Sequence, residues 1–275
     1  MPHTQSLFTR HAVGAALLVL ATAVHSQPHV VLDGSSGMLP LARALVAEYE
    51  LRGTSDRISV GTGLGTAARL PALKDGKVDV VLASHGLDPE AVRERNLRVL
   101  EVARGAIVFA VNRNVDVSSI TEAQVCDVYS GRSVDWSALS PSAAPIAVFS
   151  RPPSEVDPET IRAKVSCFKD LKAGDAVKTV ASSQDMAKAL TDTPHSIGMT
   201  SMTVAEQSAG RVKALSLAGV APTAENVKSG RYPLTRDFLF VLNAQPSPSV
   251  QRFLDFVMSA EGDEVIIRNG AVPLR

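Results

Sequence analysis

The chain has no excess of either charge, because its 28 Lys and Arg residues are balanced by 28 Asp and Glu residues. It also has few aromatic residues, 4% of the sequence, and no stretch in which aromatic and basic residues alternate. A surface that binds nucleic acid needs concentrated positive charge, because contacts with phosphates supply most of its affinity. The composition therefore gives no support for a nucleic-acid partner.

The sequence also lacks the residue patterns of common catalytic and metal sites. After residue 26 the only histidines are His29, His85 and His195, and none belongs to a cysteine or carboxylate pattern with metal-ligand spacing. No Gly-x-Ser-x-Gly or Gly-Lys-Ser/Thr sequence occurs, and the glycines of Gly61-Thr62-Gly63-Leu64-Gly65 do not have the dinucleotide-binding spacing. We therefore predict that the protein is not an enzyme and uses no cofactor or metal.

Only one long apolar run is present, and it lies near the N-terminus. Arg10 and His11 precede the apolar residues 12–24, and small residues follow up to Ser26. The run is shorter than the roughly 20 residues that a membrane-spanning helix needs, and its flanks are typical of a secretory signal. We predict that residues 1–26 are a signal peptide cleaved near Ser26, and that the mature protein is exported and soluble. An uncleaved membrane anchor is the less favoured alternative.

Cysteine is scarce, with Cys126 and Cys167 as the only two. In an exported protein an even pair favours a disulfide. Such a bridge would close a loop of about 40 residues and stabilise the fold by roughly 3–4 kcal/mol in the chain-entropy model. Two separate buried thiols remain an alternative, because the sequence does not show whether the two Cα atoms lie close enough for a bridge.

Short apolar runs alternate with amphipathic helical segments along the mature chain, which indicates an α/β fold. Strands are predicted at residues 30–32, 58–60, 78–83, 97–103, 106–111, 146–149, 196–200, 212–217 and 238–242. A helix is predicted to run from Asp157 to Phe168, with Asp157 as its N-cap and Pro158 in the first turn. Two further helices between Ser247 and Asn269 are predicted to end the chain.

Small polar turns follow several of the predicted strands. The first is Gly34-Ser35-Ser36-Gly37, which lies between a strand and a helix, and others are the segment 61–65 and Ser84-His85. The first N–H groups of a helix lack acceptors within the helix and bind anions. Open α/β sheets also place their ligands at the carboxyl ends of strands. We therefore predict that these turns line an anion-binding site, with ordinary loops as the alternative.

Residues spread over the chain resemble those of one known family, the phosphate-type solute-binding proteins of ABC importers. The resemblance covers essentially the whole mature chain in the family's order and is carried by Val111-Asn112, Ser130-Gly131, Trp136, Ser196-Ile197-Gly198, Gly219 to Asn226, Gly230 to Arg236, Phe253 to Val257, Ser259 to Gly262 and Gly270 to Leu274.

This resemblance implies a two-lobed periplasmic binding protein fold with two hinge crossings between the lobes. Lobe 1 would comprise residues 27–111 and 238–275, and lobe 2 would comprise residues 112–237. Members of the family hold an oxyanion in the cleft between the lobes with hydroxyls, backbone N–H groups and an arginine. The resemblance thus implies a periplasmic monomer that binds inorganic phosphate or a similar oxyanion and delivers it to an ABC permease in the inner membrane.

Matched onto this sequence, the family's four binding turns predict a set of ligand-binding residues in which Arg151 is the charged clamp. The set is Ser35, Ser36, Gly37, Thr62, Gly63, Ser84, His85, Arg151 and Ser154.

The fourth turn departs from the family pattern, in which a Ser-Gly-Thr triplet follows the arginine. Here Pro152 and Pro153 remove two N–H donors, and a Glu155 carboxylate that faced an anion would repel it. Glu155 would avoid this repulsion if it pointed to solvent. The departure leaves the anion's identity open. It also motivates an alternative, a binding-fold protein with an altered or vacant cleft that acts as a sensor or as an interaction or secretion accessory.

Overall fold

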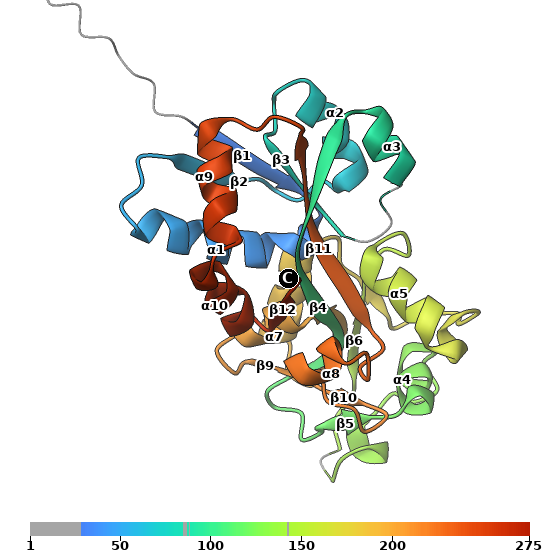
Figure 1. Ribbon diagram of the computed structural model, residues 1–275. Coiled ribbons are helices and arrows are strands. Elements are labelled where there is room, and N and C mark those ends of the chain that lie inside the picture. The colour runs from blue at the N-terminus through green and yellow to red at the C-terminus, as the bar shows by residue number, and fades with distance from the viewer. Residues whose placement is uncertain (1–28, 85–86, 88, 142) are drawn as a thin grey trace, which may run out of the picture.

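The computed structural model describes residues 29–84, 87, 89–141 and 143–275. The predicted signal peptide and His85 lie outside these described residues. The described chain forms an upper and a lower half, and two long strands run through both of them (Figure 1).

The elements alternate between helix and strand for most of the chain. The first third contains β1 (His29–Gly34), the 3-10 turn η1 (Ser36–Met38), α1 (Leu39–Leu51), β2 (Arg57–Val60), α2 (Thr66–Lys74), β3 (Val80–Ala83), α3 (Pro89–Glu94) and β4 (Leu97–Asn112). The middle contains β5 (Ser119–Ile120), α4 (Glu122–Tyr129), η2 (Trp136–Ala138), β6 (Ala147–Ser150), α5 (Val156–Lys164), η3 (Ser166–Phe168), β7 (Lys178–Thr179), α6 (Ser183–Asp192), β8 (Ser196–Ser201) and α7 (Met202–Gln207). The remainder contains β9 (Val212–Ala214), β10 (Ser216–Leu217), α8 (Ala224–Lys228), β11 (Thr235–Asn243), α9 (Pro248–Val257), α10 (Ala260–Arg268) and β12 (Ala271–Pro273).

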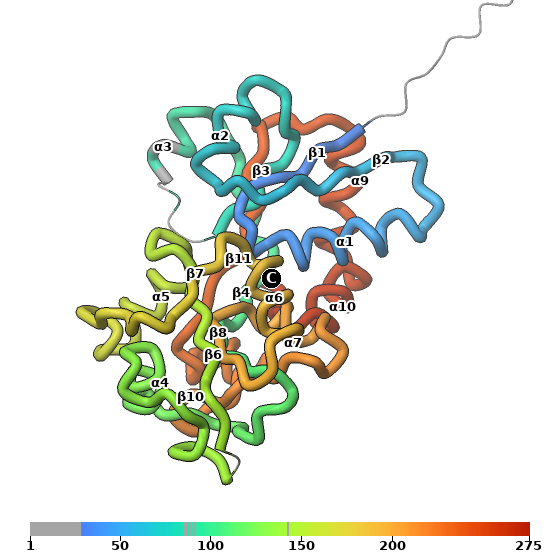
Figure 2. The backbone as a smooth tube through the Cα atoms, turned by 180° about the vertical axis from the view of Figure 1, so that it is seen from behind, coloured from blue at the N-terminus to red at the C-terminus, as the bar shows by residue number. Residues whose placement is uncertain are grey.

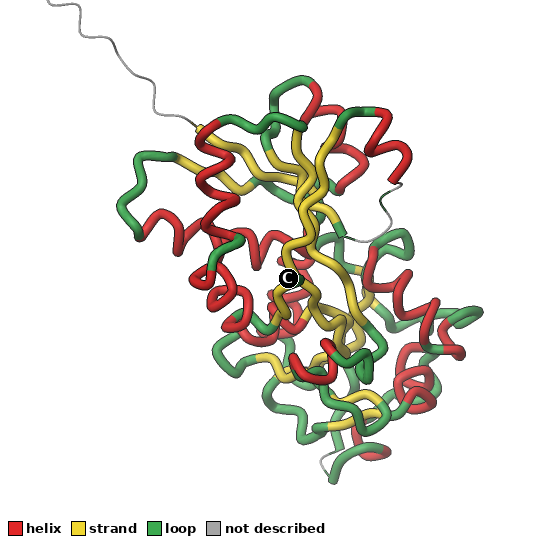
Figure 3. Tube along the Cα trace, viewed as in Figure 1, coloured by secondary structure: helices red, strands yellow, loops and turns green. Residues whose placement is uncertain are grey.

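One large mixed sheet has the strand order β2-β1-β3-β11-β4-β8-β6-β7. Its strands extend through both halves of the molecule, as the yellow segments of Figure 3 show. β1 pairs in parallel with β2 and β3, whereas β11 is antiparallel to both β3 and β4. The first part of β4, residues 97–106, pairs with β11, and its last part, residues 107–111, pairs with β8. β4 therefore belongs to both halves of the molecule.

The buried apolar residues form separate cores in the two halves. The upper core is built on residues 30–58, 80–103 and 238–271, where α1, α9 and α10 cover the sheet, and the lower core is built on residues 106–234. Along the chain, Ala103 is the last residue of β4 in the upper core and Ala106 is the first in the lower core. The chain returns from the lower core to the upper core between Leu234 and Phe238. We propose that the chain crosses between the two lobes at these points, the first of which lies earlier than the predicted boundary at 111/112.

The prediction of two strands at residues 97–103 and 106–111 is wrong, because β4 continues without a break. Gly105 falls in the gap between the two predicted strands, but it lies within β4 and faces the ring of Phe238 on the paired strand β11. A Cβ at this position would overlap that ring. The glycine thus allows close packing between strands rather than a change of direction.

Cys126 in α4 and Cys167 in η3 form a disulfide with a Cα–Cα distance of 6.3 Å. The bridge joins the two helical segments on either side of α5. It therefore constrains the part of the lower half that carries residues 151–157.

A buried polar cluster in the upper half gives a testable pH dependence. Asp56 accepts hydrogen bonds from Tyr49 Oη at 2.8 Å and from Arg252 Nε at 3.0 Å. The Arg252 guanidinium holds the pKa of Asp56 well below its usual value, although burial acts in the opposite direction. A carboxyl whose pKa is lower in the folded state stabilises the fold above its unfolded-state pKa of about 3.9, and this contribution is lost as the pH falls through the folded-state pKa.

We therefore expect the Asp56→Asn variant to be less stable than the unsubstituted protein at neutral pH and the difference to narrow below about pH 4. Urea unfolding at a series of pH values measures this difference. A difference that stayed constant down to about pH 2 would contradict this role of the Asp56 charge.

Candidate functional site

The turn after β1 is held tightly against the neighbouring strand β3. Gly34 has a φ of 153°, and a Cβ at this position would overlap the carbonyl oxygen of Leu82. The N–H of Ser35 donates to the same oxygen at 2.8 Å. Ser36 and Gly37 follow at the start of the continuous helical segment formed by η1 and α1, and both are buried. The turn therefore presents the first N–H groups of this segment, which have no intrahelical acceptor, to the space between the two halves.

Asp33, the residue before this turn, connects the first turn to the second. Its Oδ1 accepts the N–H groups of Gly34 and Gly63, each at 2.8 Å, and its Oδ2 forms an ion pair with Arg69. The N–H of Gly63, predicted to contact the ligand, is therefore already committed to Asp33. Nothing in the local sequence indicates this role, because Gly63 and Arg69, which Asp33 joins to the first turn, are 30 and 36 residues further along the chain.

The Asp33→Asn substitution is expected to destabilise the fold by about 1–3 kcal/mol, because it removes a buried carboxylate that accepts two N–H groups and leaves the half-buried Arg69 facing a neutral amide. Denaturant unfolding measures the loss. The same substitution at the exposed Asp75, which pairs with the exposed Lys77, is the matched control and is expected to change stability by less than about 0.5 kcal/mol. Equal effects at both positions would contradict the role assigned to Asp33.

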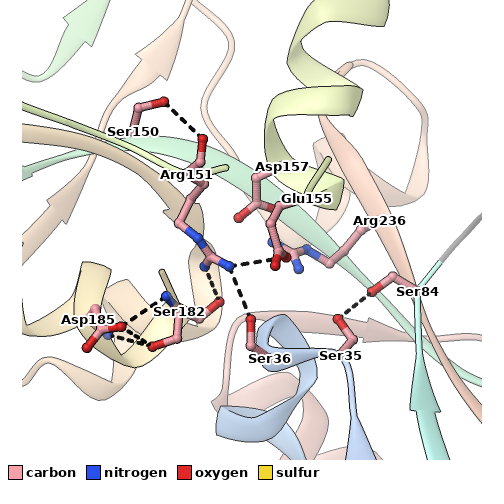
Figure 4. A network of polar contacts seen from close by, with 11 residues as sticks. Ser35, Ser36, Ser84, Ser150, Arg151, Glu155, Asp157, Ser182, Asp185 and Arg236 are labelled. Carbon is pink, nitrogen blue, oxygen red and sulfur yellow. Dashed lines mark hydrogen bonds and ion pairs between the residues drawn. The ribbon is translucent and has the colours of Figure 1, made fainter. Parts of the chain in front are cut away.

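Ser84 brings the third predicted turn to the same place. It follows β3 directly, is 3% exposed, and its Oγ lies 3.5 Å from the Oγ of Ser35. The first and third turns thus meet through a pair of buried hydroxyls, as Figure 4 shows.

Arg151 reaches this wall from the lower half. It follows β6, is 3% exposed, and donates from Nη2 to Ser36 Oγ at 3.2 Å and from Nη1 to Ser183 Oγ at 2.9 Å. Nη2 also lies 3.1 Å from Glu155 Oε2 in an ion pair, whereas Nε makes no hydrogen bond within the described part of the chain. Burial lowers the pKa of Arg151, and the charges of Glu155 and Asp185 oppose that shift.

A second arginine, Arg236, was not predicted as a site residue. It lies in β11, is 3% exposed and packs against Gly37 so closely that a Cβ on the glycine would overlap its Nη1. Its Nη2 forms an ion pair with Oδ1 of Asp157, whereas its Nε makes no hydrogen bond with any residue that the structure describes. Burial lowers the pKa of Arg236 to about 9, with the Arg151 charge acting in the same direction and Glu155 opposing both, so the side chain stays cationic at neutral pH.

The prediction that Asp157 is the N-cap of its helix is wrong. The helix, α5, begins at Val156 with Glu155 in the N-cap position, and it ends at Lys164 before the separate turn η3. Asp157 lies within the first turn of α5 and is 4% exposed, and its carboxylate pairs with Arg236. The sequence pattern Asp-Pro fits a cap, but the demand of a buried guanidinium for a counter-ion outweighs that local preference.

The structure brings together only part of the predicted ligand-binding set. Ser35, Ser36, Gly37, Ser84 and Arg151 are buried at the junction of the two halves, where α6 packs against η1 and α7 packs against α1 (Figures 1 and 2).

Two other predicted residues differ from this group, because Thr62 and Ser154 are both exposed. No group of three or more His, Cys, Asp and Glu side chains within the described residues is arranged to hold a metal ion. Within the same part of the chain, no helix is both long and apolar enough to span a bilayer.

The arrangement suits the binding of a small anion rather than catalysis. Two buried guanidiniums each carry an Nε without a hydrogen-bond partner in the described chain, and the hydroxyls of Ser36 and Ser183 accept hydrogen bonds from one of them, Arg151. Charge-assisted hydrogen bonds from guanidinium to an oxyanion are strong in such surroundings. The fold and this site together define a class, the two-lobed α/β binding proteins that enclose a ligand between their lobes.

The chain belongs to the PBP superfamily, whose domain model matches residues 21–261. It is 25% identical over 287 aligned residues to the protein SphX of Synechococcus elongatus, covering 96% of this chain and 82% of SphX. It is 26% identical to the phosphate-binding protein PstS of Bacillus subtilis, covering 89% of this chain and 80% of PstS. The second of these relatives is by name a binding protein, which agrees with the prediction that this chain is not an enzyme.

The fold is also that of solved binding proteins. A phosphate ABC transporter substrate-binding protein from Clostridium perfringens, solved with bound phosphate, superposes with a TM-score of 0.74 at 24% identity, covering 90% of this chain and all of the other. The predicted two-lobed α/β fold is therefore confirmed.

Proposed function

We propose that the protein is an exported solute-binding protein that captures inorganic phosphate or a related oxyanion between its lobes and delivers it to an ABC permease in the inner membrane. The observation that carries this proposal is the pair of buried arginines, Arg151 and Arg236, each of which has an Nε without a hydrogen bond in the described chain. Arg151 donates to the hydroxyls of Ser36 and Ser183, and Arg236 packs against Gly37 just before α1. The phosphate-binding relatives support the same ligand class.

Closure of the two lobes explains how such a site would retain its ligand. Arg151 belongs to the lower half and hydrogen-bonds to Ser36 of the upper half, so the arginine is enclosed only when the halves are together. A ligand that binds both halves shifts the population toward the closed conformation. The protein would act in this way as a periplasmic monomer, with its signal peptide cleaved near Ser26.

Isothermal titration of the purified mature protein with phosphate, sulfate, molybdate and tungstate tests the proposal. We expect phosphate to bind with a Kd in the micromolar range or below, equivalent to about −8 kcal/mol or stronger. Absence of heat with all four anions would overturn the proposal.

A second function remains open because of one observation, the ion pair between Glu155 and Arg151 inside the site. If this pair neutralises the arginine permanently, the protein would keep the binding fold without transporting a solute, and would act as a sensor or as an interaction or secretion accessory. The two functions are distinguished by the same titrations, because the second predicts no binding of any of the four anions.

A further inference from the structure

Glu155 does not perform the usual task of a residue at its position. It is the N-cap of α5 with an extended backbone, φ −83° and ψ 152°, yet its side chain makes no capping hydrogen bond to the helix. An N-cap side chain typically accepts the N–H of the second or third helical residue. The carboxylate of Glu155 instead turns toward Arg151 and lies 3.1 Å from its Nη2.

The position of this carboxylate coincides with a place that an anion would take. The Nη2 of Arg151 that meets Glu155 also donates to Ser36 Oγ at 3.2 Å, so the carboxylate lies at the junction of the two halves. The charge of Glu155 acts on Arg236 as well. Figure 4 shows Glu155 directed into the space between the two guanidiniums.

We propose that Glu155 is an internal competitor for the oxyanion site, whose carboxylate occupies Arg151 until a bound anion displaces it. This inference rests on the proposed function, because it concerns the affinity of the same site. Two anionic groups cannot share one guanidinium edge at close range without strong repulsion. The measured affinity is therefore the affinity of the uncovered site multiplied by the fraction of molecules in which Glu155 does not cover Arg151.

The exposed fractions of Glu155 and Asp157 indicate which of the two carboxylates can move away from its arginine. The Glu155 side chain is 37% exposed, so a rotation of the side chain can bring its carboxylate fully into water. The Asp157 side chain is 5% exposed and lies in the first turn of α5 against Arg236. Asp157 therefore remains as the permanent counter-ion of Arg236, whereas Glu155 is the exchangeable counter-ion of Arg151.

Isothermal titration with inorganic phosphate, at constant pH and ionic strength, tests this inference on the full mature protein. The Glu155→Gln substitution keeps the size of the side chain and removes its charge. We expect it to bind phosphate about 10-fold to 100-fold more tightly, the lower end reflecting the partial exposure of Glu155. The matched control is Glu159→Gln, an exposed glutamate in the same helix, for which we expect a change of less than about twofold.

Each outcome of this titration either supports or overturns the proposed role of Glu155. Tighter binding by Glu155→Gln but not by Glu159→Gln supports the inference. If Glu155→Gln binds phosphate and the unsubstituted protein binds none of the four anions, Glu155 is not displaced, and both the inference and the proposed function are overturned. If the unsubstituted protein binds phosphate and Glu155→Gln binds equally or more weakly, the inference is overturned and the proposed function stands. If neither protein binds, both are overturned. Thermal unfolding of the variants shows that the fold is intact, and Glu155→Ala is expected to change affinity in the same direction as Glu155→Gln.

Discussion

Replacement of Arg151 by alanine is expected to weaken phosphate binding by about 100-fold to 1,000-fold, which corresponds to roughly 3–4 kcal/mol. The guanidinium is buried and joins the two halves through Ser36 and Ser183, so its loss removes the charged donors and a contact between the halves. It also leaves Glu155 without its counter-ion beside the site, which adds to the repulsion of an anion. Isothermal titration of the variant measures the change.

The control for this variant is Arg132→Ala, because Arg132 is an exposed arginine of the lower half that pairs with Asp127. An exposed pair of this kind contributes little, so the affinity is expected to change by less than about twofold. Phosphate affinity that survived Arg151→Ala within tenfold would contradict the role of Arg151 as the charged clamp.

Loss of the disulfide is expected to lower the free energy of unfolding more than any other substitution proposed here. For the double variant Cys126→Ala, Cys167→Ala the expected decrease is about 4 kcal/mol. The two cysteines are 41 residues apart, and in the chain-entropy model a cross-link over such a distance removes this much conformational freedom from the unfolded chain. Urea unfolding with and without the bridge measures the loss.

Reduction of the unsubstituted protein by a thiol provides an independent check, because it removes the same cross-link and keeps both cysteine side chains. The two measurements are expected to agree within about 1 kcal/mol. Stability that changed by less than about 1 kcal/mol on removal of the bridge would show that the unfolded chain is already restricted near these residues.

The sequence indicated the fold class because the signals for single elements are local. The alternation of short apolar runs with amphipathic segments depends only on the periods of strands and helices, and it predicted the two C-terminal helices close to their observed bounds. The same local reasoning failed at Gly105 and at Asp157. In both places the residue's role is decided by a side chain distant in sequence, Phe238 in one case and Arg236 in the other.

The residues of the candidate site also fall into two groups, those that the sequence predicted and those that only the structure revealed. The sequence alone predicted the turn at residues 34–37 and Arg151 as parts of the site, since the first is a strand-to-helix turn of small polar residues and the second matches a family pattern. Only the tertiary structure added Arg236, Asp33 and the exchangeable position of Glu155. These roles arise because β11 pairs between β3 and β4 and brings residue 236 onto Gly37, a contact across about 200 positions of chain that no local pattern encodes. A turn that can bind an anion is thus a property of the local sequence, whereas the number and sign of the charges around it depend on strand pairing.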